Sequence, residues 1–289
     1  MTACPEFKLF ACSRAVIAEG PFQSRCDGML YWVDPCHERF FRKRGGGPYE
    51  FETFDLGIGG ISAFSQKADG TFLLFACGCK VWNWRPGEAP VLFVELPGHS
   101  LLRFNDVTTA PDGSAFCTVL PEHYEKGGGE GELWKLAPEG SFEPQHPFCR
   151  GIPNGMGISP DRRTFYFSAT SEHTVYAWDY RDGALSNRRV FLGDVNPDGL
   201  AVDAEGGVWS AQWSERLTRF NPDGTVSLDI RLPGMAISSV CFGGESMRDI
   251  FITTANYPYC ESEWFDRRVG CVMVWRNSPY TGVAIPFFG

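Results

Sequence analysis

The sequence predicts an all-β protein, a six-bladed β-propeller, and three observations lead to this fold. Six segments repeat in which a turn rich in Gly, Asp or Arg precedes a short apolar or aromatic strand. Each is followed by a second strand that usually ends at an aromatic residue. No long segment shows the 3.6-residue apolar period of an amphipathic helix. Several short strands in each of six near-equal repeats are typical of a propeller.

The repeats follow one another in order along the chain. They are CDGMLYWVD (26–34), ADGTFLLFA (68–76), PDGSAFCTV (111–119), PDRRTFYFS (160–168), AEGGVWSAQ (204–212) and SMRDIFITT (246–254). Their matching strand positions are Leu30, Phe72, Phe116, Phe165, Val208 and Ile250, at steps of 42, 44, 49, 43 and 42 residues. One small sheet cannot bury both faces alone, so the blades stack into a ring that leaves only short edges.

We therefore expect residues 1–289 to form one domain. The strand FKLFAC (7–12) precedes the first blade, and we expect it to pair in the last blade beside VAIPFF (283–288), closing the ring. A pair of β-sandwiches is the alternative architecture, but it does not explain six near-equal periods.

Composition limits the classes of partner. Hydrophobic residues make up 43% and aromatic residues 15% of the 289, enough for a large core, which excludes a disordered chain. The net charge of −9 argues against nucleic acid or an anionic membrane as the main partner. No apolar run approaches the roughly 20 residues of a membrane helix, and the first residues do not resemble a signal peptide, so a cytoplasmic location is expected. The eleven cysteines include no CxxC pair and are expected to be reduced, small apolar residues.

A candidate site follows from the repeat. About eleven residues before each matched strand position, the chain should lie in the innermost strand of its blade, beside the central channel. These positions are Glu19, Ile61, Asn105, Asn154, Asp198 and Ser239. Two carboxylates and two amides converging on a narrow channel would be unfavourable without a counter-charge. A divalent cation supplies that charge, and oxygen ligands favour Ca²⁺, Mg²⁺ or Mn²⁺ over Zn²⁺. Taken singly, the dipeptides NG, DG and ND are common turn signals; their phase with the repeat favours a metal site.

Five stretches carry a family resemblance: AEGPFQSRCDGMLYWVDP, RFNDVTTAPDGSAF, IPNGMGISPDRRTFYFS, NPDGLAVDAEGGVWSAQW and SSVCFGGESMRDIFITTA. In order and spacing the chain resembles the senescence marker protein, gluconolactonase and luciferin-regenerating enzyme family. The resemblance implies a six-bladed propeller with one divalent cation in its channel and hydrolysis of sugar lactones. By matched motif, the metal ligands would be Glu19, Asn154 and Asp198. Arg103 and Asn105 would contact the substrate.

Three departures from the family pattern concern the substrate pocket. Val107 replaces a usual Gly, Thr118 to Leu120 replace a Gly-Thr-Met motif, and Ala169 stands where an Asp is frequent. The Gly-rich segment 120–132 would form a loop over the channel mouth and offers Glu122, His123 and Tyr124 as substrate contacts. A solvated loop with no role is the alternative interpretation.

The implied chemistry is the opening of an aldono-lactone to its acid in sugar catabolism. A cation, Ca²⁺ before Mg²⁺, Mn²⁺, Zn²⁺ or Fe²⁺, would polarise the carbonyl and lower the pKa of a bound water that attacks it. Asp198 is the candidate general base, and the Arg103 guanidinium would bind sugar oxygens. Two alternatives stay open: phosphotriester hydrolysis at the same metal site, and a non-catalytic, metal-stabilised propeller used as a binding scaffold. No G-x-S-x-G motif supports a serine hydrolase.

Overall fold

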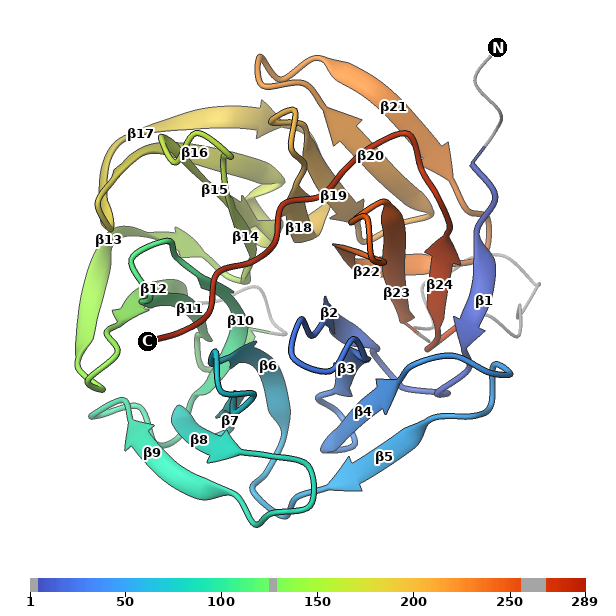
Figure 1. Ribbon diagram of the computed structural model, residues 1–289. Helices are drawn as coiled ribbons and strands as arrows, with labels where there is room; N and C mark the ends of the chain where they lie inside the picture. The colour runs from blue at the N-terminus through green and yellow to red at the C-terminus, as the bar shows by residue number, and fades with distance from the viewer. Residues whose placement is uncertain (1–4, 125–128, 256–268) are drawn as a thin grey trace.

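Six four-stranded antiparallel sheets are arranged around a central axis in the computed structural model, which describes residues 5–124, 129–255 and 269–289 (Figure 1). Blade 1 consists of β2 (Glu19–Gln23), β3 (Leu30–Asp34), β4 (Arg39–Lys43) and β5 (Glu52–Asp55). Blade 2 consists of β6 (Ile61–Gln66), β7 (Phe72–Ala76), β8 (Lys80–Trp84) and β9 (Val91–Glu95). Blade 3 consists of β10 (Arg103–Thr109), β11 (Ala115–Leu120), β12 (Glu130–Leu136) and β13 (Phe142–Arg150). Blade 4 consists of β14 (Pro153–Ile158), β15 (Thr164–Ala169), β16 (Thr174–Arg181) and β17 (Ala184–Gly193). Blade 5 consists of β18 (Pro197–Val202), β19 (Val208–Gln212), β20 (Arg216–Phe220) and β21 (Val226–Arg231). Blade 6 consists of β22 (Ala236–Gly243), β23 (Asp249–Ala255), β24 (Val272–Trp275) and β1 (Lys8–Ala11). A short 3₁₀ helix, η2 (Thr170–Glu172), follows β15.

The six-bladed propeller predicted from the repeat is confirmed. Every matched position lies at the start of the second strand of its blade, from Leu30 in β3 to Ile250 in β23. In the described part of the chain, no helix is long and apolar enough to cross a membrane.

The closure of the ring was predicted only in part. Strand β1 belongs to blade 6, as expected, but it is the outermost strand there and pairs with β24, with Lys8 opposite Val274. The expected partner segment 283–288 is not an extended strand of this sheet. Because β1 already occupies the free edge of β24, and because Pro286 has no N–H to donate to a ladder, this apolar segment is used elsewhere.

The C-terminal segment instead crosses one end of the channel, from blade 6 towards blades 2 and 3 (Figure 1). Gly282 bridges to Asp203, and the Phe288 N–H donates to the Gln66 carbonyl over 2.9 Å. The Arg25 guanidinium lies 3.9 Å from the centre of the Phe287 ring. These partners stand at or just after the carboxyl ends of the inner strands, so the segment covers that end of the channel and leaves the other end to the candidate site.

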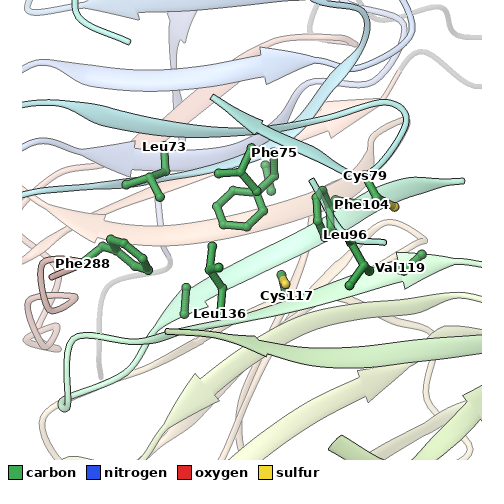
Figure 2. Packing of buried hydrophobic residues seen from close by; sticks show 12 residues of the cluster. Leu73, Phe75, Cys79, Leu96, Phe104, Cys117, Val119, Leu136 and Phe288 are labelled. Atoms are coloured by element: carbon green, nitrogen blue, oxygen red, sulfur yellow. The ribbon is translucent and has the colours of Figure 1, made fainter. Parts of the chain in front are cut away.

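The core consists of apolar clusters between adjacent blades. Figure 2 shows the cluster between blades 2 and 3, in which Phe75 of β7 packs against Phe104 of β10 with ring centres 5.2 Å apart. Phe288 of the C-terminal segment completes this cluster and is 2% exposed. Cys79 and Cys117 are buried in it as small apolar residues. Of the nine described cysteines six are buried, whereas Cys26, Cys36 and Cys77 are exposed.

Candidate active site

A β-bulge interrupts each inner strand near its first residues. The ladder register shifts between Glu19 and Phe22, Ile61 and Ala63, Phe104 and Val107, Pro153 and Met156, Pro197 and Leu200, and Ile237 and Ser239. Bulges leave residues unpaired and redirect their side chains, and they are frequent next to active sites. Asn105, Asn154 and Asp198 lie inside these bulges, and Glu19 lies at the edge of one. The candidate residues therefore lie in or next to corresponding bulges at one end of the channel, with Glu19 one ladder position earlier than Asn154 and Asp198.

The glycines that follow two of these residues allow the inner strands to approach one another. A Cβ at Gly155 would overlap the backbone of Asp198 and Leu200 in blade 5, and a Cβ at Gly199 would overlap Ser239 in blade 6. Neither glycine has a positive φ. The Asn-Gly and Asp-Gly pairs are thus not turns here. They mark points where adjacent blades pack too closely for a side chain.

Three carboxyl groups from three blades influence one another at this end of the channel. Asp198 is 3% exposed, and burial together with Glu19 and Asp106 raises its pKa well above the usual range. Burial, and then the charge of Asp106, raises the pKa of Glu19 to about 8. Burial raises the pKa of Asp106 to about 6. Glu19 and Asp106 retain some exposed area because they border the channel, but protein surrounds them, so their charged forms are poorly solvated.

Amide and hydroxyl groups tie the ligand-bearing strands together. The Asn105 side chain donates from Nδ2 to the Pro153 carbonyl over 2.8 Å, which joins blade 3 to the residue preceding Asn154. Asn154 donates from Nδ2 to the Thr170 hydroxyl over 3.2 Å. Asn154 also hydrogen bonds to Asp198, which lowers the pKa of that carboxyl against the larger effect of burial.

The predicted substrate residues separate into two groups. Arg103, the first residue of β10, donates from a terminal nitrogen to the Tyr124 hydroxyl over 3.0 Å, and its guanidinium lies 5.2 Å from the centre of that ring. Glu122 and His123 face solvent, with side chains 71% and 68% exposed, and pair with each other over 3.6 Å. Of the three loop residues, Tyr124 is the one that reaches the predicted substrate residue Arg103; positions 125–128 of the loop lie outside the described residues.

Sequence reasoning did not include Asp106 in this site. The usable signal was the position of Asp106 directly after Asn105, because a bulge spanning both residues removes the alternation that would point them to opposite faces.

Of the three departures from the family pattern, the one at Thr118 contacts the site directly. The Thr118 hydroxyl accepts the Asp106 N–H over 2.8 Å and so helps to hold the bulge of β10. Ala169 is fully buried in the cluster between blades 3 and 4. Val107 packs against the cluster between blades 2 and 3 and lines a channel cavity of about 250 Å³. Asp106 also lines this cavity, which the C-terminal segment closes with Val283 and Ile285.

The side chains at this end of the channel limit which atoms could bind a cation. Among the described residues, no three His, Cys, Asp or Glu side chains form a metal-binding group by themselves. A cation at this end of the channel would therefore combine carboxylates with amide oxygens. Such all-oxygen sets suit hard divalent cations.

The fold and the site define a class of protein: a six-bladed propeller with carboxyl and amide groups at one end of its channel. Residues 17–256 match the family model described as the SMP-30/Gluconolactonase/LRE-like region. The chain belongs to this family, as its sequence motifs predicted.

Similar proteins agree with this assignment. The chain is 33% identical to pentonolactonase XacC of Haloferax volcanii, over 83% of this chain and 81% of that protein. It is 31% identical to a 6-deoxy-6-sulfogluconolactonase of Pseudomonas putida, over 95% of both chains. Among solved structures, a calcium-binding protein, regucalcin, from Agrobacterium tumefaciens aligns over 100% of both chains with a TM-score of 0.86 at 20% identity, which supports the fold.

Proposed function

We propose that this protein is a hydrolase that opens a sugar lactone to its aldonic acid with the help of one divalent cation. The observation that carries the proposal is that Glu19, Asn154 and Asp198 lie in, or at the edge of, the inner-strand bulges of three blades at the same end of the channel. The names of its relatives, a pentonolactonase and a sulfogluconolactonase, support a sugar lactone as the substrate class.

The residues present fit a cation. Burial raises the pKa of all three carboxyl groups, Glu19, Asp106 and Asp198, and neighbouring carboxylates raise the pKa of Glu19 and Asp198 further. Without a cation, the channel therefore disfavours their charged forms. A cation bound by Glu19, Asn154 and Asp198 would offset that repulsion, with Ca²⁺ the first candidate and Mg²⁺, Mn²⁺, Zn²⁺ or Fe²⁺ the others. When bound, a divalent cation polarises a carbonyl oxygen and makes a nearby water more acidic.

The remaining roles belong to side chains of the chain. Asp198, buried and adjacent to Asn154, would accept the proton of the attacking water and return it to the ring oxygen as the lactone opens. Asn105 and Arg103 would hold the sugar. The five donors of the guanidinium suit the hydroxyls of the lactone and the carboxylate formed in the reaction. Tyr124 already orients that guanidinium.

A panel of five- and six-membered sugar lactones tests the proposal by proton release in a pH-stat. We expect hydrolysis above the spontaneous rate, lost on chelation and restored by a divalent cation. A folded, cation-loaded protein that leaves every lactone untouched would refute the proposal. Hydrolysis of a phosphotriester by that same preparation would then favour the second reaction on this site, and inactivity towards both would favour a binding scaffold.

A further inference from the structure

We propose that Thr170 is a positioning residue that turns the Asn154 amide so that its oxygen can bind the cation. This inference rests on the proposed function, because it assigns a role towards the cation that Asn154 would bind. Thr170 is the first residue of η2 and follows the buried strand β15. No sequence motif drew attention to it.

The backbone places the Thr170 hydroxyl between two ligand-bearing strands. The Thr170 N–H donates to the Ile152 carbonyl over 3.0 Å, two residues before Asn154. Its hydroxyl donates to the Pro197 carbonyl over 2.6 Å, one residue before Asp198. A single side chain therefore connects the start of β14 in blade 4 to the start of β18 in blade 5.

The hydroxyl has one proton, and this decides the orientation of the amide. A carbonyl oxygen can only accept, so the bond to Pro197 uses the proton of Thr170. The hydroxyl can then offer only a lone pair to Asn154, and the amide must present its NH₂ group, as the 3.2 Å bond from Nδ2 shows.

The second proton of the same NH₂ group can serve the hydrogen bond from Asn154 to Asp198. Both protons are then directed to protein partners, and Oδ1 is the atom left to bind a hard cation. With the amide reversed, Oδ1 would meet the lone pairs of Thr170 and the NH₂ group would face the cation. The hydroxyl therefore disfavours the orientation that cannot bind a metal.

Residues that orient metal ligands typically change affinity by about 10- to 100-fold when they are mutated. Thr170→Val removes the hydroxyl and keeps the shape, and Thr170→Ser keeps the hydroxyl. Thr174→Val is the matched control, because the Thr174 hydroxyl donates to the Glu172 carbonyl over 2.9 Å and that bond involves no candidate ligand. Binding of Mn²⁺ and Ca²⁺ is measured by calorimetry in the absence of lactone. The melting temperature in chelator shows whether each variant folds, and Thr170→Ala replaces the valine variant if that one does not.

We expect Thr170→Val to bind the cation about 10-fold more weakly or worse, with Thr170→Ser and Thr174→Val within about 3-fold of the wild type. Wild-type affinity in a folded Thr170→Val protein would overturn the inference and leave the proposed function standing. Equal losses in the serine or control variants would overturn it as well. A wild-type protein that binds no divalent cation would refute the metal site, and this inference with it.

Discussion

The carboxyl groups of the channel should destabilise the protein when no cation is bound, and the Glu19→Gln substitution tests this directly. Glutamine keeps the size of the side chain and an oxygen to accept the Gly20 N–H, which donates to Glu19 over 3.2 Å. It removes the charge. In chelator at pH 8, we therefore expect the variant to be more stable than the wild type.

The magnitude follows from the pKa of Glu19, which burial and Asp106 raise from 4.5 to about 8. At about 1.36 kcal/mol for each pKa unit, ionising this group in the folded protein would cost about 4 to 5 kcal/mol. Channel water and the sharing of protons with Asp198 and Asp106 reduce this ionisation cost. We therefore expect roughly half of it, about 2 kcal/mol, as the gain in the free energy of unfolding. For a chain of this size that corresponds to about 4 °C in melting temperature.

The direction in which stability changes with pH also follows from the pKa of Glu19. The unfolded chain releases the Glu19 proton near pH 4.5, whereas the folded chain keeps it up to about pH 8. Between these values the folded state binds more protons, so the stability of the metal-free wild type should fall as the pH rises. In Glu19→Gln this fall should be smaller.

Thermal unfolding between pH 5 and 8 in chelator, followed by circular dichroism, measures both effects. Glu95→Gln, an exposed position on β9, is the control and should follow the wild type. Added Ca²⁺ or Mn²⁺ should reverse the order, because a cation that binds the folded state stabilises it and the variant lacks one ligand. Equal pH dependence in wild type and Glu19→Gln, or a cation effect that survives in the variant, would refute the reasoning.

Three further substitutions probe other parts of the molecule. Asp198→Asn should lower the lactonase rate by roughly 10³-fold in steady-state assays if Asp198 is the general base; activity within 10-fold of the wild type would remove it from that role. Arg103→Gln should raise KM by about 10-fold or more while changing kcat less, and an unchanged KM would place the guanidinium outside the substrate pocket. Phe288→Ala should lower the free energy of unfolding by about 3 kcal/mol or more and leave cation affinity unchanged, because Phe288 fills a buried cluster at the closed end of the channel. A change in cation affinity would show that this end and the candidate site are coupled.

The sequence predicted the ring because each second strand is apolar and recurs at a near-constant step, a property that local residues determine. It could not predict the partner of β1. Both 272–275 and 283–288 are apolar, and the free edge that a strand joins depends on contacts between distant segments. Pro286 was the local sign that the later segment would not join a ladder.

The site could be predicted to the extent that it follows the repeat. Glu19, Asn154 and Asp198 recur in phase with the blades, and the structure brings them to one end of the channel. Asp106 and Thr170 were missed for different physical reasons. Strand alternation assigns Asp106 to the face opposite Asn105, and only the bulge cancels that rule. Thr170 acts across blades through one hydroxyl, and no spacing in the sequence encodes such a contact.

The most direct test of the central claim is the rate of proton release from a sugar lactone by one protein preparation, before chelation, after chelation and after cation is restored. We predict a rate above the spontaneous rate, its loss in chelator, its recovery with at least one of Ca²⁺, Mg²⁺, Mn²⁺, Zn²⁺ or Fe²⁺, and no recovery in Asp198→Asn. Lactone hydrolysis that persists unchanged in the folded, metal-free protein would contradict the account, because the three carboxyl groups of the channel would then have a role that needs no cation.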